Sequence, residues 1–186
     1  MGKRVLVVTG DGGESYETWY AIHRLLEEGH EPVLAAPSKR RLHLVMHDFE
    51  PGWDTYVERQ PGYGATADLA LADARAADFD AVLLIGGRAP EYLRHRADLI
   101  ALVREMATTG KWVLAICHGI QVLVAAELVS GRTVTCYEHV KSEVTRAGGE
   151  WSPRQAVRDG RIITAQTWES HPEFYRMVMT ALRESE

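Results

Sequence analysis

The chain has 186 residues, of which 46% are hydrophobic and 25% charged, and its formal net charge is −5. These values are typical of an ordinary globular protein and predict one domain over residues 1–186. The negative charge and the absence of a basic tract argue against nucleic acid as the main partner. The longest apolar stretch is interrupted by polar residues, so it predicts core and not a membrane span.

The first part of the chain predicts a βαβ unit followed by an irregular excursion. Residues 4–9 form an apolar strand, residues 10–13 a glycine-rich turn, and residues 15–28 a helix. Residues 31–36 form the next strand, which makes a parallel sheet with a right-handed crossover. The buried stripe of the helix is expected to consist of Trp19, Ile22, Leu25 and Leu26. The aromatic-rich segment 37–67 contains an alternating stretch at 42–46 that suggests a strand, and its length suggests a function or an interface.

The remaining chain continues the alternation of strands and helices. Residues 80–85 and 112–116 read as buried strands, and helical stripes follow each of them, up to Gly110 and about Leu128. A strand at 133–137, a short helix at 139–147, a hairpin at 155–166 and a final helix at 172–184 complete the chain. This order predicts a doubly wound, mostly parallel α/β sandwich, whose sites lie at the carboxyl ends of the strands.

Cys117 stands where the apolar strand at 112–116 must turn abruptly into a helix. The small residues Ala115 and Gly119 satisfy the steric requirement of a nucleophile elbow, which holds the central side chain out of the sheet. Unpaired N–H groups at a helix start favour a thiolate, and the N–H of His118 would face a developing oxyanion. The alternative is that Cys117 is only a small buried hydrophobic residue.

Three further loop residues belong to the same edge of the predicted sheet. Glu14 either complements the dipole of its helix or shares a proton with the Cys117 thiolate. Gly87 either forms only a tight turn or donates its N–H to an oxyanion. Glu91 is either a dipole partner or a residue that orients a histidine.

Two histidines are candidates for the same site. His118 is the obvious base, although it directly follows the nucleophile and reaches the sulfur only if the elbow is not yet regular helix. His171 either lines the site as a substrate-binding residue or serves only at a helix start.

Several other chemistries lack their signatures. There is no third glycine of a dinucleotide fingerprint, no P-loop lysine and no G-x-S-x-G elbow. Cys117 and Cys136 show no metal-ligand spacing, and His43 with His47 is a weak metal signal, so no metal, cofactor or disulfide is expected. The absence of a signal-peptide pattern predicts a cytoplasmic location with reduced thiols.

Four stretches together resemble a known family. AICHG at 115–119, GGRAPE at 86–91, the glutamate Glu14 and HRLLEEGHE at 23–31 resemble the PfpI branch of the DJ-1/PfpI superfamily, with its class I glutamine amidotransferase-like fold. The resemblance covers nearly the whole chain and implies a flavodoxin-like sandwich that forms homodimers or hexamers. It also implies that Cys117 is the nucleophile and that Glu14 hydrogen-bonds its sulfur. Glu91 of an adjacent subunit would orient His118, and the N–H groups of Gly87 and His118 would form the oxyanion hole.

The chain departs from the family pattern at three places. Ile120 replaces a proline that often follows CHG, and Glu138 replaces a proline after the tyrosine. The excursion at 42–63 is longer than in the short members and resembles a bacterial subgroup containing HDFEPGWDTY. We expect this excursion to reshape the pocket or the subunit contact.

The resemblance implies intracellular peptidase, glyoxalase and deglycase activities, and the chemistry of Cys117 ranks them. A thiolate adds readily to an aldehyde, so the first expectation is processing of reactive carbonyls by a glutathione-independent glyoxalase or protein deglycase, in protection against stress. The alternative is a cysteine peptidase or small-amide hydrolase acting on a peptide substrate, which needs a well-aligned acid for the leaving amine. A third possibility is a non-catalytic redox sensor or chaperone in which Cys117 is oxidised.

Overall fold

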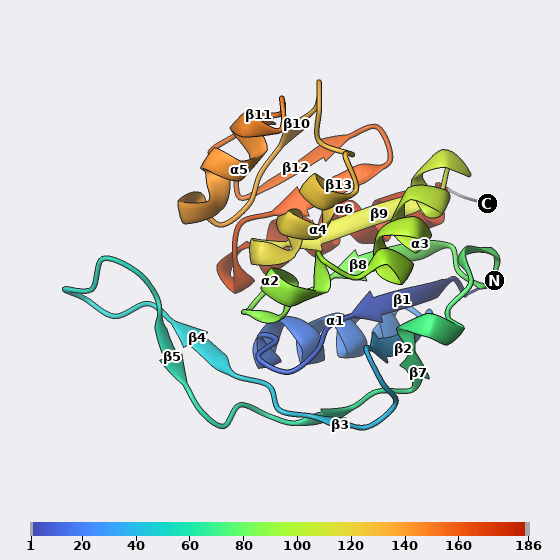
Figure 1. Ribbon diagram of the computed structural model, residues 1–186, viewed down its shortest axis with the longest axis horizontal. Coiled ribbons are helices and arrows are strands. Elements are labelled where there is room, and N and C mark those ends of the chain that lie inside the picture. The colour runs from blue at the N-terminus through green and yellow to red at the C-terminus, as the bar shows by residue number, and fades with distance from the viewer. Residues whose placement is uncertain (1, 185–186) are drawn as a thin grey trace.

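The computed structural model describes residues 2–184 and is built on a seven-stranded sheet (Figure 1). The strand order is β12-β13-β9-β8-β1-β2-β7, and every neighbouring pair is parallel except β12 with β13. The central strands β1, β8 and β9 are almost entirely buried, as expected for strands covered on both faces. The strands of this sheet are β1 (Arg4–Val8), β2 (Glu31–Ala36), β7 (Leu69–Ala70), β8 (Ala81–Leu84), β9 (Trp112–Ile116), β12 (Ala156–Asp159) and β13 (Ile162–Ala165).

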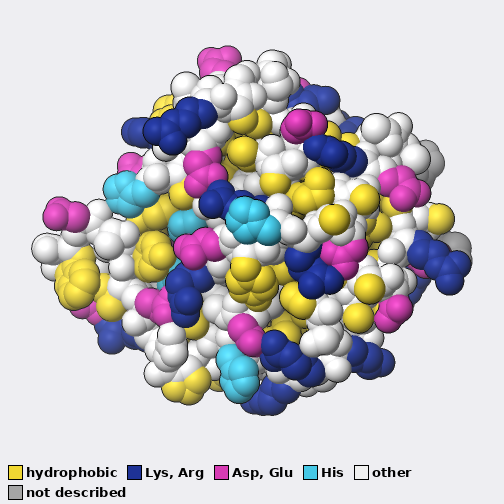
Figure 2. Space-filling model, in the orientation of Figure 1, with side chains coloured by type: hydrophobic (Ala, Val, Ile, Leu, Met, Phe, Trp, Pro, Cys, Tyr) yellow, Lys and Arg dark blue, Asp and Glu magenta, His cyan; other side chains and the backbone are white. Residues whose placement is uncertain are grey.

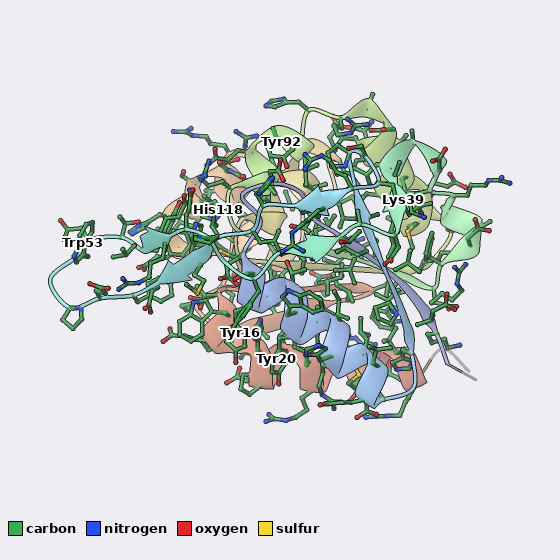
Figure 3. The ribbon with its side chains drawn as sticks, turned by 90° about the horizontal axis from the view of Figure 1, so that it is seen from below. Tyr16, Tyr20, Lys39, Trp53, Tyr92 and His118 are labelled. Carbon is green, nitrogen blue, oxygen red and sulfur yellow. The ribbon has the colours of Figure 1, made fainter. Side chains whose placement is uncertain are left out.

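Helices cover both faces of the sheet, which confirms the predicted doubly wound sandwich. Helices α1 and α6 lie side by side on one face, where the rings of Tyr20 and Tyr175 are 5.1 Å apart between centroids. Helices α2, α3 and α4 lie on the opposite face (Figure 3). The helices are α1 (Ser15–Glu27), α2 (Ala89–Leu93), α3 (Ala97–Thr108), α4 (Ile120–Ala125), α5 (Lys141–Arg146) and α6 (His171–Arg183).

The remaining elements are short. Four pieces of strand pair as β3 (Arg41–Leu42) with β6 (Ala65–Thr66) and β4 (Met46–Asp48) with β5 (Val57–Arg59). Another pair, β10 (Thr133–Val134) with β11 (Glu150–Trp151), packs beside α5. Single 3-10 turns are η1 (Leu71–Asp73), η2 (Ala76–Asp78), η3 (Cys117–Gly119), η4 (Glu138–Val140) and η5 (Trp168–Ser170).

The single strand suggested at residues 42–46 is wrong, because the segment divides between β3 and β4. Between these strands the backbone crosses the loop that precedes α1. The N–H of Gly12 donates to the carbonyl of His43 (2.8 Å), and the N–H of Val45 donates to the carbonyl of Gly13 (3.0 Å). The alternating residues therefore fasten the excursion to the first loop of the sheet edge, and the β4–β5 hairpin extends beyond it (Figure 1).

Two helix predictions also need correction. The helix expected up to Gly110 is two helices, α2 and α3, because the chain turns between them. The buried face of α1 is rotated about the helix axis relative to the predicted one. Leu26 is 55% exposed, whereas Glu17, Ala21 and Leu25 are buried. This rotation brings a carboxyl group into the core, with consequences for the site.

The surface mixes both signs of charge. Figure 2 shows acidic and basic side chains interspersed over the visible face, with hydrophobic side chains between them. Among the described residues, no helix is long and apolar enough to cross a bilayer.

Candidate active site around Cys117

Cys117 occupies the predicted elbow between β9 and the turn η3. Its φ is +57°, a left-handed conformation that an L-residue with a side chain adopts only at a cost in strain. Gly119 permits the tight turn, since a Cβ there would lie 2.3 Å from the carbonyl oxygen of Leu84. Cys117 is 6% exposed and lies at the carboxyl end of the sheet. Strain at a residue that carries a nucleophilic atom is typical of functional sites.

The loop after β8 approaches the cysteine closely. A Cβ on Gly86 would lie 2.5 Å from Cβ and 3.1 Å from Sγ of Cys117, so only glycine leaves room for the thiol. Gly87 has φ +74° and directs its backbone N–H at the sulfur, as does His118. Gly87 and His118, the two residues predicted as oxyanion donors, therefore face the same atom from different loops.

The carboxyl group that contacts the sulfur belongs to Glu17 and not to Glu14. Glu17 lies on the buried face of α1, hydrogen-bonds Cys117, and accepts the N–H of Gly86 at 2.8 Å. Glu14 instead caps α1, accepting the N–H of Glu17 at 2.6 Å and that of His47 at 3.3 Å. The sequence-based assignment of the sulfur contact to Glu14 is therefore wrong, because the cap turns its carboxylate toward backbone donors. The spacing of Glu17, Ala21 and Leu25 at every fourth position, which is one face of a helix, is the signal that would have found it.

Burial controls the protonation of this pair. Burial, and next the charge of Glu14, raises the pKa of Glu17 well above its ordinary value. Burial, and next the Glu17 carboxylate, likewise raises the pKa of the Cys117 thiol, while the N–H groups of His118 and Gly87 act in the opposite direction. A protonated Glu17 can donate to the sulfur and removes the repulsion that opposes a thiolate. The two groups are therefore coupled acids, and loss of a proton from one depends on the other.

His118 lies within reach of the thiol despite being its sequence neighbour. Its Nδ1 is 3.3 Å from Sγ of Cys117, because η3 is a 3-10 turn and not α-helix. Burial, followed by the nearby His47, lowers the pKa of His118 to about 4. The imidazole is thus neutral at neutral pH and has a nitrogen free to accept a proton.

Two predicted site residues make no hydrogen bond to Cys117 or His118 among the described residues. Glu91 is an exposed residue in the first turn of α2, and none of the hydrogen bonds of the described residues joins it to His118. His171 is buried at the start of α6, where its ring stacks on Tyr20 with 4.4 Å between centroids. Burial lowers the pKa of His171 to about 4. The helix-start alternative describes the position of His171 better than substrate binding does.

A prominent groove lies beside α1, and Cys117 is not among its lining residues. This groove of about 890 Å³ runs along the outer side of α1, and Tyr16, Tyr20 and Met46 are among its lining residues. Tyr16 and Tyr20 project from this helix in Figure 3. Among the described residues, no group of three or more His, Cys, Asp or Glu side chains is placed to hold a metal ion.

The sheet is mostly parallel and carries a strained cysteine at the turn from strand to helix, with a histidine and a buried glutamic acid in contact with its sulfur. These features place the protein in the class of α/β proteins with a cysteine at a nucleophile elbow. Residues 3–181 match the model of the DJ-1/PfpI family, and the chain belongs to this family.

Relatives of similar sequence extend the comparison. Protein DJ-1 homolog D of Arabidopsis thaliana is 35% identical over 97% of this chain, which spans only 48% of that protein. A deglycase of Pyrococcus abyssi is 36% identical over 88% of this chain and 89% of its own length. Among solved structures, a two-domain protein of Anabaena variabilis with DJ-1/ThiJ/PfpI-like and ferritin-like domains superimposes with a TM-score of 0.86 at 25% identity, covering 97% of this chain and 48% of that one.

Proposed function

We propose that this protein processes reactive carbonyl compounds through Cys117, as a glutathione-independent glyoxalase or deglycase. One observation carries the proposal: His118, the Glu17 carboxyl and two backbone N–H groups all converge on a single sulfur. The deglycase of Pyrococcus abyssi supports the same class of chemistry.

The geometry supports a sequence of steps on an α-oxoaldehyde such as methylglyoxal. The sulfur adds to the aldehyde carbon, and the carbonyl π electrons move to oxygen, where the N–H groups of Gly87 and His118 stabilise the charge. A base, His118 or Glu17, removes the proton of that carbon, and the neighbouring carbon receives a proton, which gives a thioester of the hydroxy acid. Water then cleaves the C–S bond and releases lactate and the thiol. The sum is methylglyoxal plus water giving lactate, without an external oxidant or reductant.

The test is lactate formation from methylglyoxal in the absence of glutathione. Cys117→Ala should lose turnover, and the wild-type protein should show a mass increase at Cys117 when the adduct is trapped. Cys136→Ala is the matched control, because Cys136 is the second buried free cysteine and contacts Trp151, with its carbonyl accepting from the indole N–H. Equal turnover in the wild type and Cys117→Ala would exclude the proposal.

The second candidate is a cysteine peptidase or amide hydrolase, which the 3.3 Å contact between His118 and the thiol favours. In this case a third residue must orient His118, and Glu91 of an adjacent subunit is the proposed one. Glu91→Gln should then abolish amide hydrolysis while aldehyde chemistry supported by Glu17 survives. A peptide-library assay of both proteins separates the two functions.

We also propose that the protein self-associates, as a homodimer or hexamer. The apolar groove along α1, with Tyr16 48% exposed and Met46 37% exposed, supports such a contact. Tyr16→Lys should lower the mass measured by light scattering to that of one chain, whereas a single-chain mass for the wild type would exclude self-association.

A further inference from the structure

The β4–β5 hairpin is fastened over the cysteine site at both of its ends. At its base, Glu58 accepts from Arg88 of the glycine loop at 2.6 and 3.1 Å. At its tip, Thr55 and Tyr137 share a hydrogen bond of 3.1 Å between their hydroxyl oxygens. The excursion therefore connects the loop that donates to the sulfur with the segment after β10.

Tyr56 projects from this hairpin toward the site in a fixed orientation. Its ring stacks on the buried ring of His47, with 3.9 Å between centroids and 19° between planes. His47 is itself held, since its Nε2 contacts Glu58 at 3.2 Å and its carbonyl accepts from Trp168 at 2.9 Å. The other side of Tyr56 meets His118 edge-on, with 6.0 Å between ring centroids. Figure 3 shows the hairpin running past His118 toward Trp53.

Within residues 2–184, the hydroxyl group of Tyr56 has no hydrogen-bond partner. No hydrogen bond joins it to any of the described residues, whereas the hydroxyl of Tyr137 is occupied by Thr55. Burial, and next the charges of Glu91 and Cys117, raises the pKa of Tyr56. The phenol therefore keeps its proton at neutral pH and remains available as a hydrogen-bond donor.

We propose that Tyr56 is a substrate-contacting residue of the Cys117 site, whose phenol donates a hydrogen bond to the second oxygen of an α-oxoaldehyde held at the sulfur. The backbone N–H groups of Gly87 and His118 serve the aldehyde oxygen, and the unengaged hydroxyl of Tyr56, beside His118, is the donor proposed for the neighbouring keto oxygen. The proposal rests on the proposed carbonyl chemistry and names the group that selects dicarbonyls over simple aldehydes. Neither the elbow nor the glycine loop offers such selectivity.

The experiment compares wild type, Tyr56→Phe and Tyr63→Phe. Tyr56→Phe removes only the hydroxyl and keeps the stacked ring, while Tyr63 is a 77% exposed tyrosine of the same excursion and serves as the control. Initial rates of Cys117 alkylation by iodoacetamide are followed by mass with increasing methylglyoxal or propanal, each of which masks the thiol as a hemithioacetal. Lactate formation from methylglyoxal is measured in parallel.

We expect Tyr56→Phe to need about tenfold more methylglyoxal for half protection, which is the effect of one hydrogen bond, and an unchanged concentration of propanal. Alkylation without aldehyde should proceed at the wild-type rate, which excludes a general disturbance of the site. Equal methylglyoxal protection in Tyr56→Phe and Tyr63→Phe, or equal losses for both aldehydes, overturns the proposal.

The outcomes also separate this proposal from the function on which it rests. Wild-type protection without lactate formation, weakened in Tyr56→Phe, supports the Tyr56 contact and rejects turnover. Lactate formation that is equal in all three proteins supports the function and rejects the Tyr56 contact. If methylglyoxal neither protects wild-type Cys117 nor yields lactate, both are rejected.

Discussion

Glu17 hydrogen-bonds Cys117 from the buried face of α1, two turns before Leu25 on the same stripe. The contact joins a helix on one face of the sheet to the elbow at its carboxyl edge. It places an acid whose pKa is raised by burial beside a thiol whose pKa is raised for the same reason. A pair of this kind can pass a proton between its members within the site.

Glu17→Gln should lower kcat/KM for methylglyoxal by about 100-fold, since an amide neither takes up nor releases a proton in the step. Glu14→Gln should instead weaken the α1 cap and lower the free energy of unfolding by about 1 kcal/mol, with less than a tenfold effect on turnover. The first expectation follows from the contact of the Glu17 carboxyl with Cys117, and the second from the 2.6 Å bond between the Glu14 carboxylate and the Glu17 N–H. Steady-state kinetics and denaturant unfolding of the two variants measure the contrast, and the reverse order of activities would reassign the acid to Glu14.

Gly87→Ala and Gly110→Ala form a matched pair. Both glycines have a positive φ, +74° and +73°, so alanine at either position costs about 1 kcal/mol of backbone strain. A Cβ on Gly87 would also lie 2.4 Å from the backbone nitrogen of Glu14, whereas one on Gly110 meets nothing within 4 Å. Gly87→Ala should therefore lose activity and the greater part of its stability, and Gly110→Ala should keep its activity. Thermal unfolding and lactate formation test this, and equal behaviour of the pair would contradict the close contact.

His171→Phe should make stability less sensitive to acid. The pKa of His171 is about 4 in the folded chain, below its ordinary value of 6.5, so the unfolded chain binds the proton first as the pH falls. The contribution of His171 therefore lowers the free energy of unfolding by about 2 kcal/mol between pH 7 and pH 5. The raised pKa values of Glu14 and Glu17 act in the opposite sense, and these residues are present in both proteins.

Urea unfolding of wild type and His171→Phe at the two pH values gives this difference. The exposed His95→Gln is the control and should retain the wild-type dependence on pH. A His171→Phe protein with an undiminished loss at pH 5 would place the titration elsewhere.

Thr55→Val should loosen the tip of the β4–β5 hairpin, because it removes the hydroxyl that bonds Tyr137 at 3.1 Å. Cys117 is 6% exposed, so a reagent reaches it more often when the tip is released. We expect alkylation by iodoacetamide to accelerate about fivefold, as loss of one part-buried hydrogen bond allows. The control is Thr66→Val, at an exposed position of the same excursion, in which Cys117 should be alkylated at the wild-type rate. If Cys117 of Thr55→Val is alkylated no faster than in this control, the tip does not restrict access to the thiol.

The sequence alone determined the sandwich, the elbow and the glycine loop. Buried parallel strands read as continuous apolar runs, and the turn at Cys117 needs small neighbours that are visible as letters. Gly87 and His118 followed from the same local geometry, since their N–H groups belong to loops that must meet at the edge of the sheet. These features depend on backbone sterics over a few residues.

Only the tertiary structure decided which side chains face the sulfur and how burial alters their proton affinity. Whether Glu14 or Glu17 faces the sulfur depends on the rotation of α1 about its axis, and packing against the sheet sets this rotation. The two glutamates are only three residues apart, so the sequence does not decide between them. The raised pKa of the Cys117 thiol reflects burial beneath loops distant in sequence, whereas the local sequence reveals only the favourable N–H groups. Likewise, Tyr56 reaches the site because the excursion pairs with the loop before α1 and with Arg88, and such long-range contacts leave no periodic pattern in the chain.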